Sequence, residues 1–427
     1  MRANKLLSHS LRYLCFYGFW GFIFTKTILF PPNSVYPAFS ILLVLFILSA
    51  LSVQKKRKGV NSIVLLWMPY LLLTTFSFFV ILKLESFSYW LVCVLLLSIA
   101  SRTEICSHIP KKFIFWCGVV TMVGLGVQML LPQVYNSYVR PIFTGGGSTI
   151  LMWMERGYGY NGFTYQLANT ANNLIIAEAF CLYFFEELFP KYHRKKLIYW
   201  AFFSLFVISV LLTGKRTYAL MAIGIPSIVY IVERRLSSGT FFLLLFGVFL
   251  TIIGVNYFID NASLFENSKY IHRLSETVSS SQSGDNWTSG RQELAAQAIE
   301  FFSENPLLGI GVNHFHQMSP EHTDVHNSYL QVLCEQGIVG FILFIIPLFF
   351  CLLRTISYMK RHYNDCIQIN YLKISLFIQF YFIIYALTGN VVIDFSCFSM
   401  YFLAIAIFIN VQIYDTYYQE RLKVNGN

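Results

Sequence analysis

Long apolar runs separated by short polar segments follow one another along the whole chain. Most are close to the roughly 20 residues that an α-helix needs to cross the hydrocarbon core of a bilayer. The pattern therefore predicts an all-α polytopic membrane protein with about twelve transmembrane helices, forming a single integral membrane domain over residues 1–427. The predicted helices lie near residues 12–30, 35–53, 61–82, 86–101, 113–131, 166–187, 197–213, 217–232, 240–258, 331–353, 370–388 and 391–413.

Basic residues cluster between the apolar runs and predict how the chain is oriented. If the N-terminus is cytoplasmic, 22 of the 31 Lys and Arg residues fall in inside segments and 9 fall outside. Because cytoplasmic loops carry the excess of Lys and Arg, we expect a multi-pass protein of the plasma membrane with both termini in the cytoplasm. The two long connections, outer loop 1 at 133–165 and a larger loop at 259–330, then lie on the outer face, where function is expected.

Composition narrows the class further. Apolar residues make up 56% of the chain and charged residues 12%, and the mean hydropathy is +0.57. With the charge clustered between spans, the net charge of +10 indicates the lipid bilayer as partner and excludes nucleic acid. The nine Cys residues show no CxxC pair, so they indicate neither a metal motif nor a disulfide framework.

Three of the nine cations on the predicted outer face stand out, because the orientation does not require them. Lys215 and Arg216 lie at the junction of the seventh and eighth runs, and Arg291 lies in the large outer loop. A cation at a membrane boundary is costly, which favours a functional role. The alternatives are that Lys215 and Arg216 reach toward lipid headgroups and that Arg291 is an ordinary solvated charge.

A short amphipathic helix is predicted to begin just before Arg291. Ser289 is a candidate N-cap with Gln292 three residues further on, and Leu294 and Ala298 follow on one face. Free N–H groups at a helix N-terminus and the planar fork of an arginine both suit phosphate oxygens. The pattern predicts an anionic ligand at this point.

The large loop is also expected to pack across the spans as short helices. Its apolar side chains are too many to face water, notably those of Phe301, Phe302, Leu307 and Leu308. Glycines further along supply turns and close approaches: Gly309, Gly311, Gly337 and Gly340.

His326, Asn327 and Tyr329 lie where this loop enters the tenth run. A histidine can titrate near neutral pH and act as a general base, although a surface or capping role is the alternative. A metal site is a further alternative, because HxH and HxDxH spacings put possible ligands on one side of an extended chain. These side chains are His314, His316, His322, Asp324 and His326.

Four strings in this order resemble the O-antigen ligase and polymerase superfamily: TGxRxxxL, SGRxxL, NPLLGIGxNxF and HNSYLQxLxExGIxGF. Arg216 with Leu220 matches the Arg-x-x-x-Leu element of that family, Arg291 its loop arginine, and His326 with Asn327 its His-Asn element. The motifs cover about residues 200–353, a core that includes the outer catalytic loop 259–330. The segment 155–173 matches only loosely the Arg and Gly-Asn segment of the family.

The resemblance implies that a glycan moves from an undecaprenyl-diphosphate-linked oligosaccharide to a hydroxyl of an acceptor glycan, outside the membrane, without cofactor or metal. Arg216 and Arg291 would stabilise the leaving diphosphate and His326 would act as base. Since no carboxylate pair for a double displacement stands out, the anomeric centre would be inverted. Residues implied in substrate binding are Lys215, Asn327, Tyr329 and Arg156.

Three functions remain open. A repeat-unit polymerase for capsule, exopolysaccharide or O-antigen is favoured because no appended acceptor-binding domain is seen. A ligase would instead move finished glycan to a lipid A core or another acceptor. A lipid-linked-sugar flippase is disfavoured because no internal repeat is evident. Flippase and chain-length-regulator proteins are expected partners of a polymerase.

Two acids within the predicted spans also stand out, Glu178 and Asp394. Each is interpreted either as a functional group or as a packed partner between helices.

Overall fold

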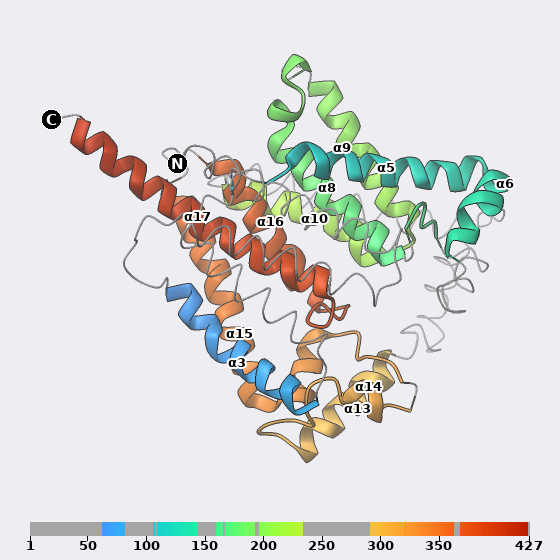
Figure 1. Ribbon diagram of the computed structural model, residues 1–427, viewed down its shortest axis with the longest axis vertical. Coiled ribbons are helices and arrows are strands. Elements are labelled where there is room, and N and C mark those ends of the chain that lie inside the picture. Colours follow the sequence, from blue (N-terminus) through green and yellow to red (C-terminus); the bar gives the residue numbers. More distant parts are fainter. Residues whose placement is uncertain are drawn as a thin grey trace, which may run out of the picture.

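The computed structural model describes residues 62–81, 106, 109–143, 159–164, 167–192, 196–233, 291–320, 322–362 and 368–425, and its elements within these ranges are helical. This confirms the all-α prediction for the described part of the chain. In chain order the elements are α3 (Ser62–Ile81), α5 (Lys111–Leu130), α6 (Pro132–Val134), η2 (Tyr135–Val139), η3 (Arg140–Phe143), α8 (Leu167–Leu188), η4 (Pro190–Tyr192), α9 (Lys196–Leu212), α10 (Arg216–Glu233), α13 (Arg291–Glu304), α14 (Phe315–Met318), α15 (Ser328–His362), α16 (Ile369–Ala386) and α17 (Phe395–Asn425) (Figure 1).

Eight of the twelve predicted runs coincide with helices in this part of the chain, whereas the runs at 12–30, 35–53, 86–101 and 240–258 lie outside the described residues. Four helical stretches are long and apolar enough to cross a membrane: Lys111–Leu130, Ser328–His362, Ile369–Ala386 and Cys397–Thr416. Shorter apolar helices cover Ser62–Phe76, Lys196–Leu212 and Thr217–Glu233.

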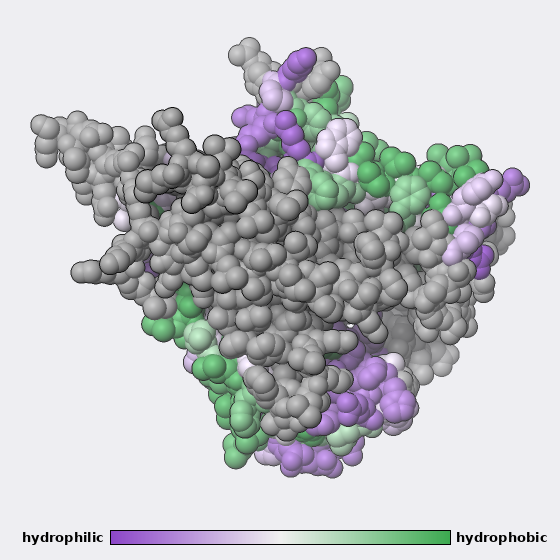
Figure 2. Space-filling view, viewed as in Figure 1, coloured by the Kyte–Doolittle hydropathy of each residue, from purple (hydrophilic) through white to green (hydrophobic). Residues whose placement is uncertain are grey.

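Large apolar side chains are exposed on the flanks of the helical assembly. Examples are Leu65 and Phe76 on α3, Leu353 on α15, and Trp116 on α5. Figure 2 shows hydrophobic surface on the flank that contains α3 and on the flank that contains α5, with hydrophilic residues gathered around α13 and α14. Water does not tolerate apolar surface on this scale, but lipid does, so these flanks fit contact with the bilayer.

The middle of the assembly is filled by α17, whose residues 400–409 are all buried. A helix that is apolar on every side is stable only when other helices surround it. Trp67 of α3 packs against Phe402 of α17 with ring centroids 4.9 Å apart, and its indole N–H donates to Cys351 Sγ of α15 at 3.4 Å. Helices α3, α15 and α17 are thus joined through one buried tryptophan.

Two ion pairs show which helix ends meet. Lys111 at the start of α5 pairs with Glu187 near the end of α8. Lys373 near the start of α16 pairs with Glu233 at the end of α10, at 2.7 Å. At their other ends, α10 and α16 also meet, because Tyr218 near the start of α10 packs against Tyr385 near the end of α16, with ring centroids 4.9 Å apart.

Helix α15 is interrupted at Gly337, which has φ 62° and ψ −168°. The break leaves two carbonyls and two N–H groups without their helical partners, and residues 306–311 of the loop before α15 supply the replacements. Ile310 N and Gly311 N donate to Cys334 O (2.9 Å) and Glu335 O (2.8 Å). In return, the amides of residues 338 and 339 donate to the carbonyls of residues 306 and 307, at 2.9 and 3.3 Å.

The short helices α13 and α14 pack against α15, as predicted for this part of the loop. Leu294 and Ala298 of α13 are buried in a small cluster with Phe315, Val325 and Cys334, and Phe301 and Phe302 pack around it. The expectation that Leu307 and Leu308 are buried was wrong, because both side chains are 67% exposed. Their backbone is what binds α15, so the side chains are turned outward.

We expect Gly337→Ala to lower the melting temperature of the full-length protein in detergent. A non-glycine residue at this φ costs about 1–3 kcal/mol, and the added Cβ would collide with the backbone of Leu307. Gly126→Ala in α5 is the matched control, since a Cβ there meets no described atom within 4 Å and alanine favours a helix. Equal melting temperatures for the two variants would show that the loop does not depend on the break.

Candidate active site

The ends of three helices carry the cations and the histidine that the sequence singled out. Arg216 is the first residue of α10 and Arg291 the first of α13, while His326 stands two residues before α15. Lys215 directly precedes α10 after a turn at Gly214, which has φ 71°. The side chain of Arg216 and all of Arg156 lie outside the described residues, so their positions stay predictions.

The charges of Lys215 and Arg291 both act on the exposed side chain of His326. Partial desolvation, then the charge of Arg291, then that of Lys215 lower the pKa of His326 from its ordinary value of 6.5. Each cation disfavours a second positive charge beside it. At pH 7 the imidazole is therefore neutral, with one ring nitrogen able to accept a proton. Three residues from separate segments of the chain come together here.

The backbone at His326 is held in an unusual conformation. His326 has φ 55°, and Asn313 and His322 in the same loop also have positive φ. Histidine and asparagine adopt this left-handed region more readily than most residues, but it is a strained state that surrounding structure must hold. Next to it, Asn327 Oδ1 accepts the amide N–H groups of Tyr329 (3.0 Å) and Leu330 (3.2 Å).

Asn327 and Tyr329, both predicted to bind substrate, have structural partners. The Asn327 carbonyl oxygen caps the start of α15. The Tyr329 hydroxyl donates to Ile383 O of α16 at 2.9 Å. Between them, Ser328 Oγ donates to Gly389 O at 2.8 Å. The His-Asn element is thus fastened to the end of α16, which fixes the direction from which His326 faces the site.

The possible metal ligands of the loop do not gather into one centre. His316 Nδ1 lies 3.7 Å from Asp324 Oδ1, and burial raises the pKa of Asp324 while His316 lowers it. Within the described ranges, no group of three or more His, Cys, Asp or Glu side chains is arranged to hold a metal ion. His316 and Asp324 therefore form a local contact within the loop.

Glu335 fixes the loop from within α15. It is buried, and its Oε1 accepts the amide N–H of Phe315 at 3.4 Å and the side-chain N–H of Gln331 at 3.5 Å. Phe315 begins α14 and is itself fully buried, edge-on to Phe301. This acid, which the sequence reasoning passed over, ties α13 and α14 to the segment that carries His326.

Sequence reasoning also missed an aromatic group next to the cations. Tyr385, near the end of α16, packs against Tyr218 of α10 and Tyr381 of α16, with ring centroids 4.9 and 5.8 Å apart. The charges of Arg291 and Asp394 both act on Tyr385. Asp394 Oδ1 accepts the Cys397 amide at 3.4 Å, so this acid lies before α17 rather than within a span.

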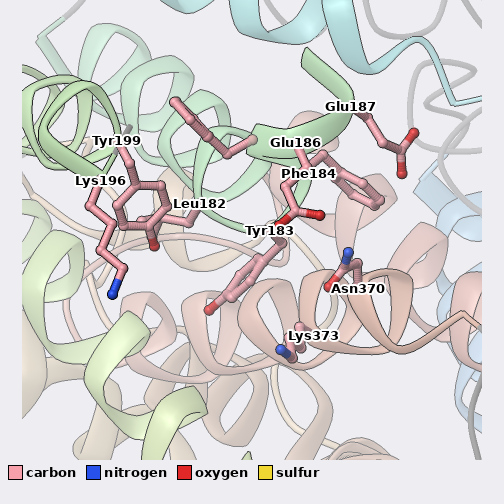
Figure 3. Close-up of a pocket in the computed structure, with 10 residues that line it drawn as sticks. Leu182, Tyr183, Phe184, Glu186, Glu187, Lys196, Tyr199, Asn370 and Lys373 are labelled. Carbon is pink, nitrogen blue, oxygen red and sulfur yellow. The ribbon is translucent and has the colours of Figure 1, made fainter. Parts of the chain in front are cut away.

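The cavity drawn in Figure 3 lies at the end of α8 and the starts of α9 and α16. It measures about 450 Å³ and is lined by residues that include Tyr183, Lys196, Tyr199 and Lys373. Glu178 lies buried in α8, and neither of its carboxyl oxygens has a hydrogen-bond partner among the described residues. None of the predicted site residues lines this cavity, so it is separate from the group around His326.

Residues 201–345 match the family model described as O-antigen ligase. The matched segment runs from within α9 into α15 and includes Lys215, Arg216, Arg291, His326 and the break at Gly337. No curated protein matches the chain.

The proximity of the cations to His326 can be tested without any assumption about activity. Diethyl pyrocarbonate modifies neutral imidazole, so the extent of modification of His326, followed by mass spectrometry, should rise with pH through a midpoint below 6.5. Lys215→Gln should move that midpoint upward, because a positive neighbour is removed. His362, exposed at the other end of α15, is the internal control for reagent access and should be modified to the same extent in both proteins. An unchanged His326 midpoint in the variant would contradict the proximity.

Proposed function

We propose that this chain, whose residues 201–345 carry the O-antigen ligase domain, is a membrane glycan transferase acting as a polysaccharide repeat-unit polymerase. It moves an undecaprenyl-diphosphate-linked oligosaccharide onto a sugar hydroxyl at the outer face of the membrane. The single observation that carries the proposal is the meeting of Lys215, Arg291 and a neutral His326. Cations beside a neutral base are what a reaction with a diphosphate leaving group and a hydroxyl nucleophile requires.

The reaction exchanges one bond for another at the anomeric carbon of the donor sugar. The bond from that carbon to the diphosphate oxygen breaks, and a bond to the acceptor oxygen forms on the opposite face, which inverts the centre. His326 takes the proton of the acceptor hydroxyl. Negative charge grows on the diphosphate, where Arg216 and Arg291 stabilise it, so the proposed reaction needs no metal.

The low pKa of His326 supports its role as base. An imidazole that carried a proton at pH 7 could not accept another, and the cations that bind the diphosphate keep His326 neutral. Once the diphosphate occupies the site, its negative charge offsets those cations. The pKa of His326 then rises, which strengthens it as a base when the donor is bound.

A ligase is the second candidate, because the family model that matches is described as O-antigen ligase. The ligase would use the same donor and the same base, and it would differ only in its acceptor. We favour the polymerase on the sequence argument above. The two are distinguished by what the glycan is attached to after the reaction. A polymerase lengthens a chain that is still linked to lipid, and a ligase moves the chain to a new anchor.

We also propose twelve spans with both termini in the cytoplasm and the site on the outer face. The support is that Lys215, Arg291 and His326 lie at one end of the helices, whereas Lys111, Lys373 and their partners lie at the other. Most of the chain's basic residues then face the cytoplasm.

Replacing Arg291 or His326 by Ala should abolish polymer while the protein remains in the membrane at its normal level. Lysine in place of Arg291 should rescue poorly, because it lacks the fork that binds two phosphate oxygens at once. Arg354→Ala, an exposed arginine toward the other end of α15, is the control and should make normal polymer. The readout is polysaccharide length on a gel. Wild-type polymer from the His326 variant would exclude the mechanism.

The orientation is tested by labelling single cysteines with a reagent that does not cross membranes. Glu300→Cys, exposed on α13, should be labelled in intact cells. His362→Cys, exposed at the end of α15, should be labelled only after the cells are permeabilised. The unsubstituted protein measures the background labelling of native cysteines. The six Cys residues described contribute little to it, because they are buried or half-buried. The reverse pattern would invert the proposed topology.

A further inference from the structure

The group that contains His326 continues on one side into a half-buried tyrosine and a carboxylate. Tyr385 and Asp394 flank the turn between α16 and α17, and Ser328 Oγ binds Gly389 O within that turn. Since Ser328 is two residues from His326, the turn is held against the loop that carries the proposed base. Neither Tyr385 nor Asp394 lies in the segment that matches the ligase family model.

The ring of Tyr385 is held by rigid neighbours. Tyr218 and Tyr381 pack against it, and Tyr381 is fixed by a hydrogen bond from its hydroxyl to Asn172 Oδ1 of α8 at 2.7 Å. Gly389 lies directly against the Tyr385 ring, because a Cβ at Gly389 would collide with it. Tyr218 and Tyr381 are buried whereas Tyr385 is half-buried, so Tyr385 is the member of the group that a ligand can reach.

This arrangement suits a sugar better than it suits a phosphate. The C–H face of a sugar ring packs on an aromatic face, and its hydroxyls need hydrogen-bond acceptors. Asp394 supplies a carboxylate, which would repel a diphosphate. The charges of Arg291 and Asp394 both act on Tyr385, so the aromatic ring is near both the cation proposed to bind diphosphate and an acid that a neutral sugar can use.

We propose that Tyr385 and Asp394 form the acceptor-sugar subsite of the transferase. The Tyr385 ring packs under the terminal sugar of the acceptor, and Asp394 accepts hydrogen bonds from its hydroxyls. The attacking hydroxyl is thereby presented to His326, while the donor diphosphate stays on the side of Arg291. This inference rests on the proposed function. It assigns Tyr385 and Asp394 to binding of the acceptor sugar and not to binding of the donor.

The test uses the purified full-length protein with two probes. The donor is the undecaprenyl-diphosphate-linked repeat unit isolated from cells that lack this gene. The acceptor is the free repeat-unit oligosaccharide, released from the same lipid by mild acid and labelled at its reducing end. Transfer is measured while the acceptor is titrated at fixed donor, so that KM for the acceptor and kcat are obtained separately.

Three variants separate binding from folding. Tyr385→Leu keeps an apolar side chain against Tyr218 but removes the flat ring, and we expect it to raise the acceptor KM about tenfold with kcat within about threefold. Tyr385→Phe keeps the ring and should retain nearly the wild-type KM. Asp394→Asn keeps a residue able to cap α17 and should raise the acceptor KM severalfold. Tyr138→Ala, at an exposed tyrosine of η2, is the control and should leave KM unchanged.

The outcomes distinguish this subsite from the function on which it rests. A wild-type acceptor KM in Tyr385→Leu and Asp394→Asn, with Arg291→Ala inactive, would overturn the subsite and leave the transferase proposal standing. No Arg291-dependent transfer by the wild-type protein would overturn both. A raised acceptor KM in Tyr385→Leu that Tyr385→Phe restores, with kcat within about threefold, is the result we expect.

Discussion

The break of α15 at Gly337 is the constraint on which the rest of the site depends. Inside a membrane protein every backbone polar group needs a partner, so an interrupted helix is tolerated only where another segment supplies the missing hydrogen bonds. Residues 306–311 do so with four backbone hydrogen bonds. Because both partners are backbone, the outer loop can lie in only one register on α15. That register sets the distance from α13, which begins with Arg291, to the loop that carries His326.

The proposed reaction makes two different chemical demands near His326. A leaving diphosphate calls for cations, whereas an acceptor sugar calls for an aromatic face and hydrogen-bond acceptors. The charges of Arg291 and Lys215 act on His326, and the charges of Arg291 and Asp394 act on Tyr385. In the mechanism we propose, the cations that bind the donor also favour the neutral histidine, which links donor binding to proton acceptance.

Patterns along the sequence predicted those features of the fold that depend on residues close to one another in the chain. Helical spacing identified Leu294 and Ala298 as the buried face of α13. Order along the chain singled out Arg291 and His326 as candidate site residues, and in the structure the charge of Arg291 acts on His326. Gly337 was expected to supply a turn or a close approach, and it does. That it interrupts α15 could not be predicted, because a glycine in an apolar run is common in membrane helices and the compensating hydrogen bonds come from another segment, residues 306–311. Tyr385 was missed because a tyrosine at the end of a span is ordinary at a membrane boundary.

The most direct measurement is deletion of the gene in the cell that makes this protein, followed by analysis of its lipid-linked sugars and its surface polysaccharide. The account predicts that single repeat units accumulate on undecaprenyl diphosphate and that long polymer disappears, because the polymerising step alone is lost. Long polymer that accumulates on the lipid would assign the chain to the ligase instead. Polymer of normal length at its normal anchor would contradict the account.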